Sequence, residues 1–443
     1  MQGLMENPGS PAARLEARQR QMVLWMSFTG FTLMFAVWLM FGVLGIPIRQ
    51  EFNLSDAQFA WLSAVAILNG AVWRLLFGIL TDRVGGRVVF STLMFVTAIP
   101  ALLISHVSSY PQLLVLAFFV GIAGNSFSVG ISWVSAWFPK NQQGFALGLF
   151  GAGNVGASLT KLIGPGLIAL VPGALLGGLI PGGWRFVPTL YAALLIIWGM
   201  LVLLLTPRVD RKPGSGRAVA EMLEPLREIR VWRFSLYYVA VFGAYVALSA
   251  WLPKYYVDVF GLELRNAALL TALFIFPASL LRPLGGYLSD RFGARRIMYA
   301  TFALMLLATG ALMMPEGHIV LETASGSRSV LPWHVGVELF TGLVVLVGVA
   351  MGVGKAAVYK HIPEYFPNDV GAVGGLVGML GALGGFVLPP LFAAAQGWTG
   401  LPQSTFGILF VVALLSLTWM HLTVVSLLNR ASPQLEHRFE HLS

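Results

Sequence analysis

Long apolar segments separated by short polar stretches dominate this chain. Each apolar segment is long enough to cross a hydrocarbon core of roughly 30 Å, which takes about 20 helical residues. Alternating segments of about ten residues, which mark a membrane β-barrel, do not occur in the sequence. The pattern predicts an all-α polytopic membrane protein with twelve transmembrane helices, at residues 22–47, 57–81, 88–107, 110–138, 143–171, 186–206, 234–253, 264–289, 297–314, 335–362, 370–396 and 403–428.

A polar stretch at residues 207–233 lies midway between these segments. It begins with Pro, Gly and Ser, as linkers do, and its AEMLEPLREI portion predicts a short surface helix. We therefore expect two pseudo-symmetric six-helix bundles. The predicted organisation is a tail at 1–21, a bundle at 22–206, a linker at 207–233, a second bundle at 234–428 and a tail at 429–443.

The charged residues are few and unevenly placed. They make up 11% of the chain, and the 28 Lys and Arg exceed the 19 Asp and Glu. Four of these cations fall inside spans, five fall in loops at one end of the spans, and the remaining 19 lie at the end that carries both termini. The positive-inside rule places both termini in the cytoplasm. This distribution along membrane loops argues against nucleic acid as a partner, and with no cysteines in the chain disulfides are excluded.

One motif occurs twice. The segment Arg74–Arg87, RLLFGILTDRVGGR, returns 208 positions later as Arg282–Arg296, RPLGGYLSDRFGARR. In each copy a glycine follows the first arginine after four positions and an aspartate after eight. The glycine allows close helix packing, and the aspartate can pair with arginines or with the positive N-terminus of a neighbouring helix. We interpret the shared residues as an inner-face gating and packing cluster of Asp82, Arg83, Asp290 and Arg291.

The four cations inside the spans are Arg74, Lys161, Arg282 and Lys355, whereas Glu338, near an outer end, is the one acid predicted there. Charges inside a membrane are costly and by default mark functional sites. Because cations prevail, we expect an anionic substrate. Eight helical residues correspond to about 12 Å, which places both arginines near the middle of the membrane. Two facing guanidiniums can hold one planar oxyanion through paired N–H···O bonds.

The two lysines leave alternatives open. Aligning Phe366-Pro367 with Phe138-Pro139 places Lys355 at the depth of Phe127. Lys355 could then add anion affinity, release a proton more readily than an arginine, or bind backbone carbonyls in a structural role. Lys161 is expected further out, either in an outer vestibule or in a structural role.

Two glycine-rich segments, residues 144–156 and 371–385, lie fifth in their halves. Glycines three and four residues apart line one helix face with hydrogen atoms, which favours close packing and sliding between helices. The glycines that we expect to act in helix packing and gating are Gly151, Gly153, Gly156, Gly378, Gly381 and Gly384.

The repeated G-x-L-x-D-R-x-G-x-R pattern resembles the loop signature of the major facilitator superfamily. The paired glycine-rich segments, with Asn154 and Leu388-Pro389, resemble the nitrate/nitrite porter family within it. This resemblance implies alternating access in a bacterial inner membrane, with nitrate or nitrite as substrate and no cofactor or metal. It also implies that Arg74 and Arg282 bind the anion and that the site includes Asn154, Phe127, Tyr238, Phe242 and Lys355.

A lysine at position 355 departs from the small polar residues typical of the exchangers in that family. We therefore expect a monomer that imports nitrate with protons for assimilation, with Lys355 and Glu338 as candidates for proton coupling. Nitrate/nitrite antiport is the first alternative, and exchange of organic anions or phosphate esters is the second. A non-transporting nitrate sensor is disfavoured because no folded cytoplasmic domain is expected. An enzyme is disfavoured because no phosphate loop, metal cluster or nucleophile motif occurs in the spans.

Overall fold

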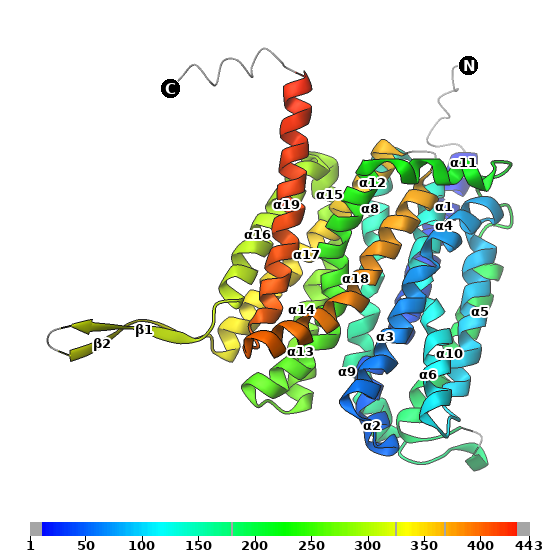
Figure 1. Ribbon diagram of the computed structural model, residues 1–443. Helices are drawn as coiled ribbons and strands as arrows, with labels where there is room; N and C mark the ends of the chain where they lie inside the picture. The colour runs from blue at the N-terminus through cyan, green and yellow to red at the C-terminus, as the bar shows by residue number, and fades with distance from the viewer. Residues whose placement is uncertain (1–10, 179, 324–325, 367–368, 432–443) are drawn as a thin grey trace.

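The chain folds as a bundle of long helices running in the same general direction (Figure 1). The computed structural model describes residues 11–178, 180–323, 326–366 and 369–431. In these ranges ten helical stretches are long and apolar enough to cross a membrane, or eleven if a bent pair counts as one span. Helix α16 (Ala294–Leu312), which packs against two such helices, supplies the twelfth pass. The all-α polytopic fold expected from the sequence is therefore confirmed.

The N-terminal half contains the first six passes. Their elements are α1 (Pro11–Trp38), α2 (Phe41–Phe52), α3 (Asp56–Val72), α4 (Arg74–Val84), α5 (Gly86–Ile104), α6 (Tyr110–Val120), η1 (Gly121–Asn125), α7 (Ser126–Trp137), α8 (Lys140–Gly151), η2 (Ala152–Val155), α9 (Gly156–Leu170), η3 (Leu176–Gly178), η4 (Gly183–Arg185) and α10 (Phe186–Leu205). The linker contains α11 (Val219–Leu223) and η5 (Glu224–Arg227), where a short helix was expected.

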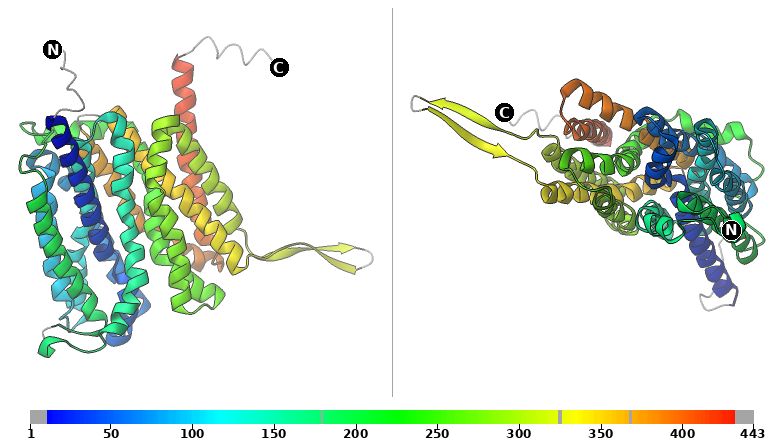
Figure 2. Two further views of the ribbon diagram at one scale, coloured as in Figure 1. Left: turned by 180° about the vertical axis from the view of Figure 1, so that it is seen from behind. Right: turned by 90° about the horizontal axis from the view of Figure 1, so that it is seen from below.

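The C-terminal half contains the other six passes. Their elements are α12 (Ile229–Tyr238), η6 (Val239–Gly243, a π-helical turn), α13 (Ala244–Phe260), α14 (Leu264–Leu280), α15 (Arg282–Phe292), α16, β1 (Gly317–Thr323), β2 (Gly326–Trp333), α17 (Val337–Tyr365), α18 (Val370–Thr399) and α19 (Ser404–Ala431). The strands pair antiparallel as a hairpin that projects sideways from the bundle (Figure 2).

Several boundaries differ from the sequence-based expectation, among them the start of α12 at Ile229, inside the expected linker at 207–233. Helix α1 begins at Pro11, inside the expected tail of residues 1–21, and the first pass ends at Trp38, where residues 22–47 were expected to be one helix. Residues 1–10 of that tail and residues 432–443 of the expected tail 429–443 lie outside the described residues. The residues between the spans expected at 297–314 and 335–362 contain the hairpin, which the hydropathy pattern did not predict.

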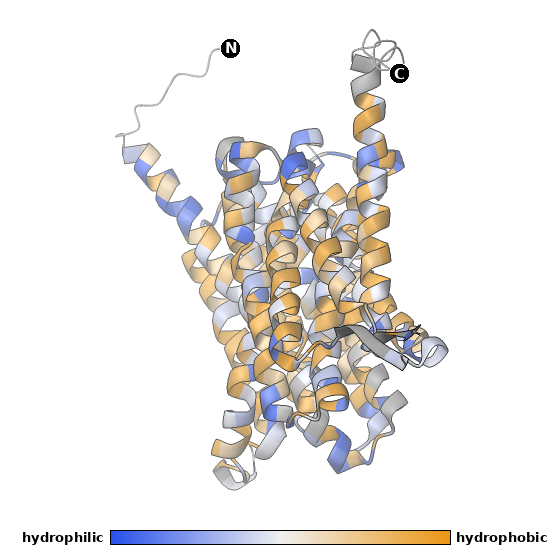
Figure 3. Ribbon diagram, turned by 90° about the vertical axis from the view of Figure 1, so that its left-hand side faces the viewer, coloured by the Kyte–Doolittle hydropathy of each residue, from blue (hydrophilic) through white to orange (hydrophobic). Residues whose placement is uncertain are grey.

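Helix α1 begins and helix α19 ends at the same end of the bundle, where α11 also lies (Figure 1). We call this the linker end, and the opposite end, nearer the β-hairpin, the hairpin end. Apolar residues cover the middle of the molecule, and polar residues gather towards both ends (Figure 3). This banding is what a bilayer-spanning bundle requires, because its middle faces hydrocarbon.

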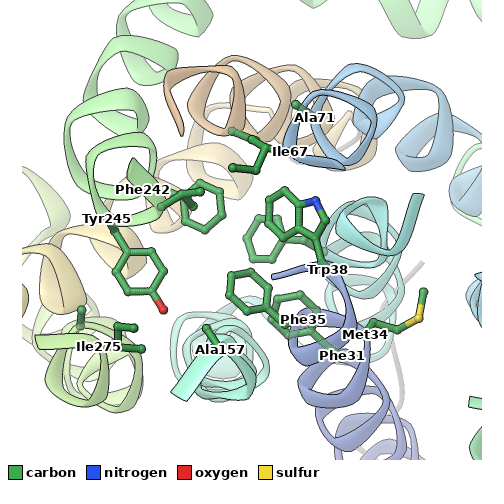
Figure 4. Packing of buried hydrophobic residues seen from close by; sticks show 14 of the residues in the cluster. Phe31, Met34, Phe35, Trp38, Ile67, Ala71, Ala157, Phe242, Tyr245 and Ile275 are labelled. Carbon is green, nitrogen blue, oxygen red and sulfur yellow. The ribbon is translucent and has the colours of Figure 1, made fainter. Parts of the chain in front are cut away.

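The two halves pack against each other through pairs of helices that the repeat relates. Helix α4 packs on α18, and α15 packs on α8. Gly78 and Gly286 make these contacts possible, because a side chain at either position would collide with the carbonyl oxygen of Gly371 or Gly144. Buried rings continue the contact at the centre, where Phe242 and Tyr245 of the C-terminal half point towards Trp38 and Phe35 (Figure 4).

Candidate functional site

Arg74 and Arg282 each begin the second segment of a broken helix. The residue before each arginine interrupts the helix with nearly the same backbone angles, φ −88° and ψ 0° at Trp73 and φ −83° and ψ 0° at Leu281. The two helix segments around Trp73 are bent by 40°. The sequence repeat therefore reproduces the local backbone geometry as well as the residue types. Both arginines are fully buried, with exposed fractions of 0% and 1%.

Two of the three guanidinium nitrogens of Arg74 donate hydrogen bonds to backbone carbonyls. Its Nε donates to Gly70 O at 2.9 Å, and its Nη1 donates across the two halves to Gly378 O at 3.1 Å. Its Nη2 is buried without a partner. The guanidinium carbon lies 5.3 Å from the Trp38 ring and 5.2 Å from the Phe242 ring, so aromatic faces partly replace the lost hydration.

Arg282 has more free donors. Its Nε and Nη1 are buried without a hydrogen-bond partner. The guanidinium occupies the space that a side chain at Gly151 would need, since an added Cβ there would lie 2.5 Å from Cζ. Gly151, one of the glycines expected to act in packing, is thus the residue that makes room for this arginine.

Phe127 contacts both arginines. Their Cζ atoms are 5.3 Å and 5.2 Å from the centre of its ring. Phe242 and Tyr238 stack on the same ring at 6.0 Å and 6.2 Å, with interplanar angles of 13° and 16°. The three aromatic residues expected from the resemblance therefore form one stacked group, and all three are fully buried.

Lys355 of α17 and Asn154 of η2 contribute further free polar atoms. The Nζ of Lys355 lies 3.3 Å from the centre of the Tyr245 ring and 5.9 Å from that of Phe242, and it has no hydrogen-bond partner. The amide of Asn154 is fully buried with both its oxygen and its nitrogen unpaired. Buried polar groups normally have hydrogen-bond partners, so the free N–H groups of Lys355 and Asn154 could donate to a bound acceptor.

Two further tyrosines, which the sequence analysis did not select, also belong to the site. Tyr359 contacts Phe127 edge-on at 5.2 Å and donates to Gly374 O at 2.9 Å, and Tyr245 lies under Lys355. Tyr359 is one helical turn after Lys355, and Tyr245 is three residues after Phe242. Residues three or four positions apart share a helix face, so both tyrosines could have been predicted from Lys355 and Phe242.

The site holds positive charge without a nearby carboxylate. In the described ranges, no carboxylate forms an ion pair with Arg74, Arg282 or Lys355. Glu338 is exposed in the first turn of α17, 17 residues or about 25 Å from Lys355. The structure therefore does not bring Glu338 together with the other candidates. An anion would supply the missing negative charge and accept the free N–H groups.

The linker end of the site is closed by the aspartates of the repeat. Asp82 packs against Gly371 in the first turn of α18, and Asp290 packs against Gly144, the fifth residue of α8. Each aspartate thus lies near the N-terminal end of a helix of the opposite half, where negative charge is favoured. Asp290 also forms an ion pair with Lys360 at 2.6 Å. Arg83 and Arg291 are exposed beside this contact and do not pair with either aspartate in the described part of the chain.

The hairpin end of the site is closed by Lys161. This lysine is 7% exposed, and its Nζ donates to Ser249 O at 2.6 Å, which joins α9 of one half to α13 of the other. The remaining glycines of the predicted set also lie at close contacts: Gly153 and Gly156 face α1, Gly378 faces Tyr359, Gly381 faces Tyr238 and Gly384 faces η6. With both ends closed, the cluster around Arg74, Arg282 and Lys355 is occluded in this conformation.

Comparison with known proteins identifies the family. The family model described as Major Facilitator Superfamily matches residues 26–319 and 271–440. The chain belongs to the major facilitator superfamily. A relative from Thermus thermophilus named "Probable nitrate/nitrite antiporter NarK1" is 70% identical over 96% of both chains. The "Nitrite extrusion protein" of Bacillus subtilis (strain 168) is 30% identical over 87% of this chain and 91% of its own length. The resemblance to nitrate/nitrite porters is thereby confirmed, and the chain is a transporter and not an enzyme.

Solved structures show the same fold at low identity. A crystal structure of the human organic anion transporter MFSD10 matches with a TM-score of 0.68 and 15% identity over 90% of this chain and 99% of that one. The transporter FucP in its outward conformation matches with a TM-score of 0.63 and 17% identity over 89% and 99%. At these identities the likeness concerns the fold alone.

Proposed function

We propose that this transporter exchanges nitrate and nitrite across a bacterial inner membrane by alternating access. The observation that carries the proposal is the occluded group of Arg74, Arg282 and Lys355, which has free N–H groups and forms no ion pair with a carboxylate in the described residues. The name of the relative that is 70% identical supports the same assignment. The linker end, which holds most of the Lys and Arg, would face the cytoplasm under the positive-inside rule.

The geometry suits a small planar oxyanion. Charge-assisted N–H···O bonds from two guanidiniums are strong and directional, and nitrate presents its oxygens in one plane. The stacked rings of Phe127, Tyr238 and Phe242 leave flat apolar walls beside these donors. A bulky phosphate ester would need a larger polar cavity than these aromatic walls provide, so the proposal favours nitrate and nitrite over organic anions.

Exchange follows from the charge of the empty site. Three cations confined without a counterion repel one another, and buried unpaired charges cost several kcal/mol each. Closing the two halves around an empty site should therefore be unfavourable, whereas closing them around an anion should be favoured. A carrier that reorients only when loaded moves one anion out for each anion in.

The second candidate is nitrate/proton symport, the coupling that the sequence favoured. The supporting observation is Lys355, whose Nζ faces the Tyr245 ring without a hydrogen-bond acceptor. A neutral lysine at this position would leave two cations in the site, and its reprotonation would accompany the anion. Under this mechanism Lys355→Gln would abolish the response to a pH gradient while anion binding persists.

Proteoliposomes can separate the two mechanisms. Uptake of labelled nitrate is measured with internal nitrite, with no internal anion, or with an imposed pH gradient, while an internal dye reports pH. Exchange predicts uptake that requires internal nitrate or nitrite and moves no protons. Uptake into anion-free vesicles that follows the pH gradient would contradict exchange and support symport. Glycerol phosphate added in excess serves as the test for an organic-anion exchanger, which it would inhibit.

A further inference from the structure

A second cluster of basic and unpaired polar groups lies at the linker end of the C-terminal half, apart from the anion site. It lines a pocket between α12, α16, α17 and α19. Arg233 and Tyr237 come from α12, Arg295 from α16 and His361 from α17. Neither the repeat nor the transport site explains why these groups converge here.

Two polar side chains in this pocket are buried without a partner. Tyr237 is 1% exposed and its hydroxyl has no hydrogen bond, and His361 is 8% exposed with Nδ1 unpaired. The imidazole is held in place by the Phe234 ring, which stacks on it at 5.1 Å with an interplanar angle of 4°. Because a buried unpaired group costs about 1–3 kcal/mol, the arrangement indicates a missing acceptor in the pocket.

The pocket is also positively charged. The guanidiniums of Arg233 and Arg295 both act electrostatically on the Tyr237 hydroxyl and on the His361 ring. Over the part of the chain that the structure describes, neither arginine forms an ion pair with a carboxylate. The missing acceptor is therefore expected to be an anion.

The fourth wall of the pocket indicates where this anion comes from. It consists of four side chains of α19, of which Met420, Val424 and Leu427 are apolar and Thr423 is polar. Only 22% of the most apolar window of that helix is buried inside the protein, the smallest share among the candidate spans in the described ranges. Trp232, beside Arg233 and 47% exposed, is a side chain typical of the headgroup level of a bilayer. The pocket thus lies where lipid headgroups meet the protein.

We propose that this pocket binds the phosphate of an anionic phospholipid, with the acyl chains lying along α19. Its enclosed part measures about 20 Å³, room for one oxygen-sized group. One phosphoryl oxygen enters it and accepts hydrogen bonds from the Tyr237 hydroxyl and from Nδ1–H of His361. The other oxygens face Arg233 and Arg295 at the mouth. Basic pockets between helices on the cytoplasmic side are a known physical basis for lipid selectivity.

Bound lipid would brace α12 against α16 and α19. Tyr237 and Tyr238 are consecutive residues, and they serve different sites, since Tyr238 stacks in the anion site. The lipid therefore holds the start of the helix that presents Tyr238 and Phe242 to the substrate. The lipid site does not depend on which anion is transported, so the two proposals can fail separately.

The test measures retention of lipid by the purified full-length protein. Native mass spectrometry compares phosphatidylglycerol with phosphatidylcholine for the wild type, for Arg233→Gln/Arg295→Gln and for the control Arg208→Gln/Lys212→Gln. The control removes the same charge from exposed linker residues at the same end. We expect about 30-fold weaker phosphatidylglycerol binding in the pocket variant, from roughly 1 kcal/mol per arginine, and little change in the control.

Tyr237→Phe keeps every charge and removes only the hydroxyl, so it tests the pocket if the double variant fails to fold. We expect it to weaken phosphatidylglycerol binding several-fold. Equal retention by the wild type and all pocket variants would overturn the proposal, as would equal losses in pocket and control variants. Displacement of the lipid by millimolar inorganic phosphate would also overturn it, because the site would then belong to a soluble anion.

Discussion

Arg74 and Arg282 occupy equivalent positions of the two halves, yet they differ in how much of each guanidinium is available. Both follow a helix break of the same geometry and both contact Phe127. Arg74 donates twice to backbone carbonyls and keeps Nη2 free, whereas Arg282 keeps Nε and Nη1 free. The repeat thus determines where the arginines lie, and their neighbours determine what they can bind.

This asymmetry suggests a division of labour. The bond from Arg74 to Gly378 O links α4 to α18, so Arg74 contributes to the contact between halves as well as to the charge of the site. Arg282 keeps Nε and Nη1 free on different sides of its guanidinium, so it is better placed than Arg74 to donate hydrogen bonds to an anion.

The largest expected effect comes from replacing each arginine by lysine. We expect Arg282→Lys to weaken nitrate binding about 100-fold, because two free directional donors become a point charge, and Arg74→Lys to weaken it about 10-fold. Arg74→Lys should also lower the melting temperature, since two carbonyls lose their donor. Calorimetric titration with nitrate and thermal unfolding measure the two effects, with Arg208→Lys as control. Equal losses of binding, or a larger loss for Arg74→Lys, would contradict the division of labour.

Substituting alanine for the glycine beside each arginine also tests the difference between Arg74 and Arg282, with only one added methyl group. An added methyl group at Gly151 would lie 2.5 Å from Cζ of Arg282, whereas at Gly378 it would lie 3.5 Å from Cδ of Arg74 and 2.8 Å from the Tyr359 hydroxyl. We expect Gly151→Ala to reduce nitrate binding about tenfold and Gly378→Ala to reduce it less. Gly166→Ala is the matched control, because no atom lies within 4 Å of the added group. Binding unchanged in Gly151→Ala would show that Arg282 can move without loss.

Much of the site could be predicted because it depends on spacing along helices. Asp82 follows Arg74 by eight positions, and this spacing sets the depth of the arginine in the membrane. The repeat has the same spacing, so it predicts the same depth for Arg282. The hydrogen bonds that engage the Arg74 guanidinium could not be predicted. Their acceptors are the backbone carbonyls of Gly70 and Gly378, and every residue has such a carbonyl. The carbonyl that Lys161 binds on the opposite half escaped prediction for the same reason.

The membrane-spanning helices could be predicted because the length of each apolar segment determines them. Other parts of the fold were less predictable. Twelve passes follow from hydropathy, but the hairpin at Gly317–Trp333 lies outside the spans and depends on pairing between two short strands. The break at Trp73 has no proline or glycine at the break itself, whereas Pro283, directly after Arg282, is a local signal for the helix start that follows Leu281.

Lys161 of the N-terminal half extends the comparison from the middle of the site to its hairpin end. Its bond to Ser249 O exists only while the halves are closed there. We expect Lys161→Gln to raise the rate at which a cysteine at Val246, which lines the same pocket, is labelled, by about tenfold. The chain has no cysteines of its own, so labelling reports this position alone. Lys254→Gln, which removes an exposed lysine of α13, is the control. Equal labelling rates in both variants would show that the bond from Lys161 to Ser249 O does not hold the two halves closed.

The smallest expected effect concerns an ion pair that distinguishes the loops of the two halves at the hairpin end. Glu51 of α2 accepts hydrogen bonds from Trp184 Nε1 at 2.6 Å and from Arg185 Nη2 at 2.5 Å. In the C-terminal half, the corresponding loops at 261–263 and 400–403 are joined by no ion pair within the described residues. Burial acts to raise the pKa of Glu51, but the Trp184 and Arg185 bonds outweigh it and leave the pKa below its ordinary value of 4.5.

The direction of the pH effect follows from that lowered pKa. A carboxyl group that binds protons more weakly in the folded protein contributes stability above its unfolded pKa, and the contribution is lost as pH falls through the folded pKa. We therefore expect the melting temperature of the wild type, relative to Glu51→Gln, to fall as the pH is lowered from 6 to below about 4. Because the Glu51 side chain is 43% exposed, the difference should stay within about 1 kcal/mol. A constant difference between the two proteins over this pH range would mean that the pair contributes nothing to holding the N-terminal loops together.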